Sequence, residues 1–147
     1  MIFEKSAGVV VFRKTKNGEI LYLLLKSTSG YLDFPKGNIE KGESDEQTMR
    51  REVEEESGLK DIVLVEGFKE KIKYFYRREG QPINKEVVYF LGETKTENVK
   101  VSWEHVGFEW MSFKEAFERV KFENAKSILK KANEFLAGGK GLEKFLK

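Results

Sequence analysis

The sequence contains no cysteine and no marked excess of one charge, and each absence narrows the kind of protein it encodes. Without cysteine, disulfide bonds and thiolate metal sites are excluded, which fits a reducing compartment, and we expect a cytoplasmic protein. The 27 Lys and Arg nearly balance the 25 Asp and Glu. A net charge of +2 is too small for a dedicated nucleic-acid binder, so nucleic acid is not an expected partner.

Long apolar runs are also absent. No uninterrupted apolar stretch approaches the ~20 residues needed to span a bilayer, and the N-terminus lacks the basic and apolar segments of a signal peptide. We therefore expect no membrane partner. The 147 residues, 39% of them hydrophobic and 13% aromatic, suffice for the core of one ordinary domain. We expect one domain over residues 1–147, with residues 140–147 as a loosely held basic tail.

Short apolar and β-branched segments predict strands along most of the chain. The Asn17-Gly18 pair predicts a tight hairpin turn between the first two, and a loop rich in turn formers follows over residues 27–43. Apolar residues at helical spacing predict two helices near the C-terminus, the second ended by Gly138-Gly139. The pattern predicts an α+β fold in which helices cover a mixed sheet. The expected strands are 7–12, 20–25, 62–68, 72–76, 86–91, 99–101 and 107–111, and the two helices are 112–120 and 125–136.

A further helix is predicted between Ser44 and Gly58. Ser44 and Gln47 have the spacing of a capping box, and Gly58 stands where a C-terminal glycine belongs. Met49 and Val53 would bury one side of this helix against the sheet.

Three carboxylates of this helix, those of Glu52, Glu55 and Glu56, fall within an arc of roughly 100°. Carboxylates so close repel one another unless a cation is present, and a cluster of hard oxygen donors suits Mg²⁺ or Mn²⁺. A metal that bridges phosphate oxygens withdraws charge from phosphorus and favours attack by water. The same composition is also typical of a solvated helix face with i,i+4 ion pairs. The spacing of the whole segment favours the metal site.

Residues 37–59 resemble the Nudix box, Gly-x5-Glu-x7-Arg-Glu-U-x-Glu-Glu-x-Gly-U, where U is aliphatic. The resemblance implies an α/β/α sandwich around a mixed sheet and hydrolysis of a nucleoside diphosphate linked to another group. It also implies that Glu52, Glu55 and Glu56, together with Gly37, hold the metal and that the glutamates are catalytic, while the general base stays unassigned. Arg51 is expected to pair with Glu43 and so tie the loop to the helix. Every defined position of the box is filled: Gly37, Glu43, Arg51, Glu52, Val53, Glu55, Glu56, Gly58 and Leu59.

Shorter motifs from residue 7 to residue 136 are similar to those of asymmetrical diadenosine tetraphosphate hydrolases, which yield ATP and AMP. They include Phe34-Pro35-Lys36-Gly37 ahead of the box, residues 85–90, and Glu104-His105. The resemblance implies a dinucleoside polyphosphate as the small-molecule partner. Around residues 31–34 and at Asn38 the chain departs from the family, which usually has Trp or His there, and these departures concern the phosphate and base contacts.

Five residues are candidates for substrate binding. Lys36 and Lys85 could neutralise a polyphosphate, although each could equally be an ordinary surface lysine. Tyr74 could stack on adenine, with Tyr76 on the same strand face as its substitute. Phe122 could supply the opposing ring or instead fill a gap in the core.

Glu104 matches a position where the family carries an acidic residue near the metal, so it is a candidate metal ligand or general base. The alternative is an ordinary loop carboxylate. His105, the single histidine, is expected to be structural or exposed. Other nucleotides remain alternative substrates: a nucleoside triphosphate, ADP-ribose or an RNA 5′ end. The non-enzymatic alternative is a catalytically silent domain that only binds nucleotides. Such domains typically lose one or more glutamates of the box, and this chain keeps all of them.

Overall fold

The computed structural model describes residues 1–139, so the predicted tail over residues 140–147 lies outside the described chain. It has a mixed sheet with three α-helices, which confirms the predicted fold class. The strands are β1 (Ile2–Lys14), β2 (Ile20–Ser27), β3 (Leu32–Asp33), β4 (Lys36–Asn38), β5 (Val63–Arg78), β6 (Gln81–Glu93) and β7 (His105–Met111). The helices are α1 (Asp45–Ser57), α2 (Phe113–Arg119) and α3 (Glu123–Glu134), and a π-helical turn, η1 (Phe135–Gly139), follows α3.

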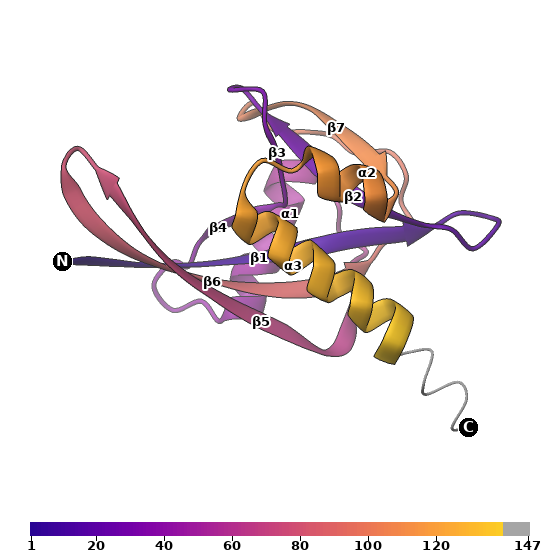
Figure 1. The fold of residues 1–147 in the computed structure, drawn as a ribbon, viewed down its shortest axis with the longest axis horizontal. Coiled ribbons are helices and arrows are strands. Elements are labelled where there is room, and N and C mark those ends of the chain that lie inside the picture. Colours follow the sequence, from indigo (N-terminus) through magenta and orange to yellow (C-terminus); the bar gives the residue numbers. More distant parts are fainter. Residues whose placement is uncertain (140–147) are drawn as a thin grey trace.

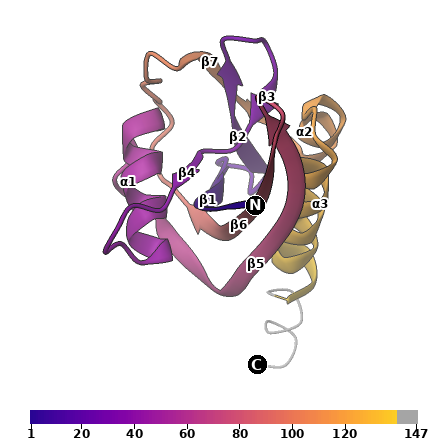
Figure 2. The same cartoon turned by 90° about the vertical axis from the view of Figure 1, so that its left-hand side faces the viewer.

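The seven-stranded sheet separates two helical layers. Its order is β3-β2-β1-β6-β5, with β4 also paired to β1 and β7 to β2. The central pair β1–β6 is parallel and the other pairs are antiparallel. Helix α1 covers one face, and α2 and α3 cover the other (Figures 1 and 2). Within residues 1–139, no helix combines the length and apolar character that a membrane span requires.

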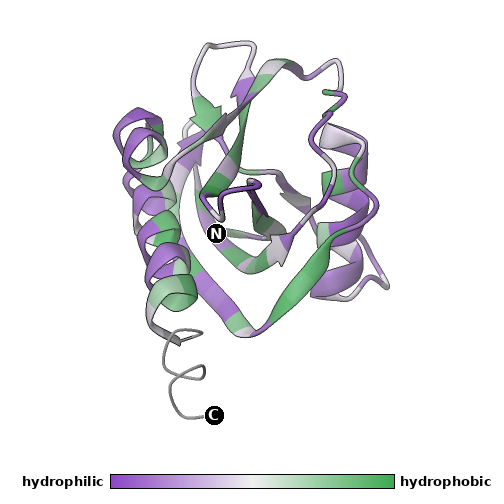
Figure 3. Ribbon diagram, turned by 90° about the vertical axis from the view of Figure 1, so that its right-hand side faces the viewer, coloured by the Kyte–Doolittle hydropathy of each residue, from purple (hydrophilic) through white to green (hydrophobic). Residues whose placement is uncertain are grey.

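Strand β1 builds both cores because its side chains alternate between the two faces of the sheet. Val9 and Val11 belong to the core beneath α1, whereas Val10 and Phe12 belong to the core beneath α2 and α3. All four are fully buried. Figure 3 shows hydrophobic segments concentrated on the strands between the helical layers.

Four sequence expectations need correction. The segments 62–68 and 72–76 form the single strand β5, with a register shift between Leu64 and Lys69 where Gly67 has φ +91°. Residues 32–33 and 36–38, expected in a loop, form β3 against β2 and β4 against β1. Residues 99–101 form no strand, although Val99 is buried in the core beneath α1. Helix α3 ends at Glu134, and the residues expected to stop it lie in η1 instead.

Candidate active site

Helix α1 begins and ends where its capping residues predict. The Ser44 hydroxyl accepts the Gln47 N–H at 3.1 Å, and the Gln47 side chain accepts the Ser44 N–H at 2.9 Å. Gly58 adopts φ +75°, and its N–H donates to the Glu54 carbonyl at 2.8 Å. Because both ends are fixed, the rotation of α1 sets where its carboxylates point.

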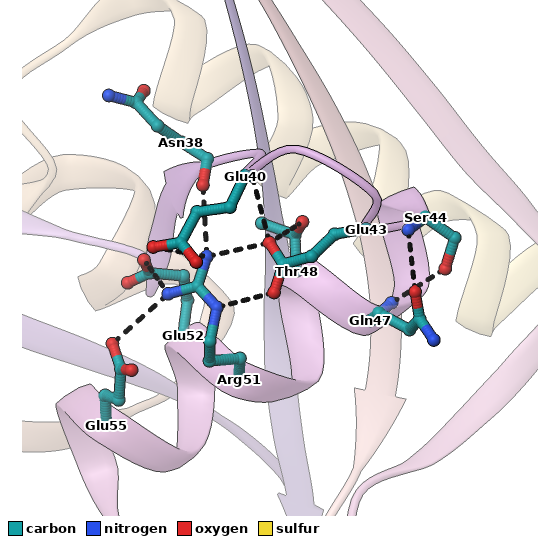
Figure 4. Close-up of polar contacts among 9 residues, drawn as sticks. All are labelled: Asn38, Glu40, Glu43, Ser44, Gln47, Thr48, Arg51, Glu52 and Glu55. Atoms are coloured by element: carbon teal, nitrogen blue, oxygen red, sulfur yellow. Dashed lines mark hydrogen bonds and ion pairs between the residues drawn. The ribbon is translucent and has the colours of Figure 1, made fainter.

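Arg51 ties the preceding loop to α1, as predicted (Figure 4). Its Nε and Nη2 donate to the two oxygens of Glu43 at 2.7 and 2.9 Å, and Nη2 also donates to the Asn38 carbonyl at 3.1 Å. Its Nη1 lies 2.9 Å from Glu52 and 3.4 Å from Glu55. One guanidinium therefore holds the loop and orients two carboxylates of the box.

Glu43 is held in its charged form by this network. Hydrogen bonds from Arg51, from the Glu40 backbone N–H and from the Thr48 hydroxyl lower its pKa to about 2. The same contacts fix the loop that enters α1, so Glu43 serves the architecture of the site.

Gly37 makes room for the carboxylate of Glu52. A Cβ at position 37 would lie 2.1 Å from Glu52 Cδ and Oε1, far inside any real contact. Only glycine therefore allows the Glu52 carboxylate to rest against β4.

Glu56 is buried beside a second carboxylate. Glu56 is only 7% exposed. The pKa of Glu56 is raised by burial, by a hydrogen bond with Glu52 and by the charges of Glu52 and Glu104. A hydrogen bond with the Lys36 backbone lowers it in part. Two adjoining carboxylates in a shielded position favour a divalent cation, and all-oxygen donors suit Mg²⁺ or Mn²⁺.

Glu55 lies outside this carboxylate pair. Its side chain is 57% exposed and contacts Arg51. Over residues 1–139 no three acidic or histidine side chains converge into a complete ligand set. The donor pair therefore fits a cation that keeps waters and takes further oxygens from a phosphate.

A cavity of about 630 Å³ opens beside Glu56, within the size range of small-molecule sites. Six of the predicted site residues line it: Lys36, Glu56, Tyr74, Tyr76, Glu104 and Phe122. Glu52, Glu55, Gly37 and Lys85 are not among its lining residues. The cavity thus joins an acidic wall to a set of aromatic rings.

The two predicted lysines have different surroundings. Lys36 lines the cavity, and its Nζ lies 3.0 Å from Asp33 Oδ2. Burial opposes its charge, but Tyr89 and Asp33 raise its pKa above the ordinary value. Lys85 is 9% exposed and donates to Asn38 Oδ1 at 2.9 Å and to Glu4 at 3.4 Å.

The aromatic rings of the cavity come from distant elements. Tyr74 and Tyr76 share a face of β5, with ring centroids 6.1 Å apart. Phe122, just before α3, meets Tyr31 edge to face at 5.1 Å. Phe122 is 40% exposed, so it is not a core residue. These rings offer apolar faces to a planar ligand.

Two further residues line the cavity: His105, which the sequence analysis expected to be structural or exposed, and Asp33, which it did not propose as a site residue. His105 Nε2 lies 3.9 Å from Glu56 Oε1, and its Nδ1 lies 3.4 Å from the Ser102 hydroxyl. Burial lowers the pKa of His105 despite the opposing charges of Glu104 and Asp33. The only sequence signal for His105 is its place directly after Glu104, and for Asp33 its spacing of three from Lys36.

Comparison with known proteins gives a consistent result. The family model described as the NUDIX domain matches residues 3–131. The asymmetrical bis(5'-nucleosyl)-tetraphosphatases of Sus scrofa and Mus musculus are 34% and 32% identical over 143 residues, covering 90% of this chain and 95% of each relative. A crystal structure of a C. elegans Ap4A hydrolase binary complex superposes with a TM-score of 0.80 at 31% identity, covering 92% of this chain and 98% of that one.

Proposed function

The chain belongs to the NUDIX domain family, and on that premise we propose that it hydrolyses a phosphoanhydride bond of diadenosine tetraphosphate, releasing ATP and AMP. The observation that carries the proposal is the composition of the cavity, in which the carboxylates of Glu56 and Glu104 share one space with several aromatic rings. Relatives named for this activity match over 90% of the chain, which supports the substrate class.

The acidic wall supplies the proposed chemistry. We assign Glu52 and Glu56 as the principal ligands of Mg²⁺ or Mn²⁺, with Glu55 and Gly37 completing the set implied by the box. A divalent cation bound there would neutralise the phosphate oxygens next to the bond that breaks. We assign Glu104, an exposed carboxylate of the cavity wall, as the group that accepts the proton of the attacking water.

The remaining wall supplies substrate contacts. Lys36 would pair with phosphate oxygens, since it lines the cavity and carries a positive charge beside Asp33. Tyr74 or Tyr76 from β5 and Phe122 from the start of α3 would stack on one adenine. Base–aromatic stacking contributes about 1–3 kcal/mol per base, enough to favour a nucleotide over free polyphosphate.

Product analysis tests the proposal directly. Purified protein with Mg²⁺ and diadenosine tetraphosphate should give equimolar ATP and AMP on ion-exchange chromatography. Glu56→Gln should abolish turnover, whereas Glu54→Gln, an exposed glutamate of the same helix, should not. Removal of divalent metal with a chelator should stop the reaction, and added Mg²⁺ should restore it.

Three results would contradict the proposal in different ways. Two ADP molecules would mean cleavage at the centre of the chain of phosphates. Turnover only of ADP-ribose, a nucleoside triphosphate or an RNA 5′ end would keep the hydrolase and change the substrate. Full activity after removal of the metal would eliminate the assigned role of the carboxylates.

A further inference from the structure

Trp103 is the most exposed large apolar side chain in the described part of the chain, at 89%. It stands in a turn closed by the His105 N–H, which donates to the Ser102 carbonyl at 3.0 Å. The other tryptophan, Trp110, is partly buried, and its indole N–H donates to the Glu97 carbonyl at 2.9 Å. Trp103 therefore contributes little to the packing of the fold, and packing does not explain why a tryptophan stands at this position.

The turn that carries Trp103 is fixed to the catalytic end of α1. The Ser102 N–H donates to the Glu56 carbonyl at 3.3 Å, and the Lys100 N–H donates to the Ser57 carbonyl at 3.0 Å. His105, at the other end of the turn, lies beside the Glu56 carboxylate. Hydrogen bonds to the end of α1 therefore fix the turn that carries the Trp103 ring.

Trp103 also adjoins the cavity wall. The next two residues, Glu104 and His105, both line the cavity, and consecutive Cα atoms are about 3.8 Å apart. Trp103 itself is not a lining residue, but its position in the chain is next to the cavity wall, in a turn bonded to the end of α1. A ligand that extends out of the cavity past Glu104 would meet the turn that carries Trp103.

The rings assigned to the first adenine lie on the other side. Tyr74 and Tyr76 belong to β5, and Phe122 precedes α3. Figure 2 shows α1 and α3 on opposite sides of the sheet. A nucleotide with its base against β5 and α3 and its phosphates at Glu56 would send the rest of its phosphate chain towards α1 and the turn.

We propose that Trp103 is the stacking platform for the second base of a dinucleoside polyphosphate. This inference rests on the proposed function, because a substrate with one base would have nothing to place there. An indole offers a broad π-face that stacks on a purine without needing hydrogen bonds, and an exposed ring is already available for contact. Trp103 would then select substrates with two bases over those with one.

The test compares two substrates that differ in the second nucleoside, diadenosine tetraphosphate and adenosine 5′-tetraphosphate. Trp103→Ala should lower the ratio of their kcat/KM values by about 5- to 150-fold, mainly through KM for the dinucleotide. Trp103→Phe should fall between wild type and Trp103→Ala. Phe75→Ala is the matched control: Phe75 is an exposed aromatic at 68%, but alternation along β5 points its side chain to the opposite face from Tyr74 and Tyr76, which line the cavity. It should leave the ratio unchanged.

A second measurement reports contact directly. The chain has two tryptophans, so intrinsic fluorescence of the inactive Glu56→Gln variant can be followed while diadenosine tetraphosphate is added. Quenching should be present with the dinucleotide, weaker with adenosine 5′-tetraphosphate, and lost when Trp103→Phe is added.

An unchanged substrate ratio in Trp103→Ala, or equal quenching by both ligands, would overturn the inference while leaving the proposed function intact. A wild-type enzyme that does not cleave diadenosine tetraphosphate would instead overturn the proposed function. The fluorescence titration would then still decide whether Trp103 contacts a second base.

Discussion

Gly37→Ala should disable the enzyme while leaving its fold in place. The added Cβ would lie 2.1 Å from Glu52 Cδ, so the carboxylate must retreat by more than about 1 Å to reach an ordinary contact. A displacement of about 1 Å in a catalytic group costs about 100-fold in rate. We therefore expect kcat for diadenosine tetraphosphate to fall about 100-fold. The free energy of unfolding should fall by less than about 1 kcal/mol, because the only clashing atoms end a flexible side chain that can rotate away.

Two variants separate this cause from others. Gly107→Ala adds the same methyl group in a strand where it meets no atom within 4 Å, and it should keep wild-type kcat and stability. In a Glu52→Ala background the clashing partner is absent, so Gly37→Ala should cost little further stability to urea. Wild-type kcat in Gly37→Ala, or a loss of stability on adding Gly37→Ala to the Glu52→Ala background, would refute the steric argument.

Arg51→Lys should lower the free energy of unfolding by about 1–2 kcal/mol, because lysine cannot reproduce the bidentate contact with Glu43. Arg50→Lys, at an exposed position of the same helix, should change the free energy of unfolding measured in urea by less than about 0.5 kcal/mol. Glu43 has its pKa lowered in the folded state, so its contribution is present above about pH 4.5 and lost as the pH falls towards about 2. Thermal unfolding across that range should therefore show a smaller pH dependence in Glu43→Gln than in wild type, and equal slopes would contradict the ion pair. Lys85→Met should cost about 0.5–1.5 kcal/mol in urea unfolding, because it removes the hydrogen bonds that Lys85 donates to Asn38 and Glu4, while Glu4 keeps Tyr76 and Arg78 as partners. A raised KM with unchanged unfolding would instead identify Lys85 as a phosphate contact.

Local chemistry allowed the sequence to predict the helix that carries the site. Ser44, Gln47 and Gly58 act within one or two turns of their own positions, so the capping box and left-handed C-cap could be predicted without knowing the fold. The pairing of Arg51 with Glu43 likewise follows from their spacing in the box. Alternating and helical apolar patterns predicted the mixed sheet and its helical layers for the same reason.

The length and pairing of the strands could not be predicted as well from the sequence. Residues 36–38 join the sheet only because β1 offers them a partner, and β5 continues through Gly67 because β6 pairs with it on both sides of the bulge. Such pairings depend on segments far away in the chain, and local propensity does not encode them.

The sequence by itself indicated the family and the helix that presents the carboxylates, and it predicts a metal site, because these depend on spacing within 23 residues, 37–59. Only the tertiary structure decided which other groups share the cavity. It placed Asp33 beside Lys36 and His105 beside Glu56, and it enclosed Lys85 between Glu4 and Asn38. The contacts of His105 with Glu56 and of Lys85 with Asn38 and Glu4 join residues 47 to 81 positions apart, and local patterns in the sequence do not encode such long-range contacts.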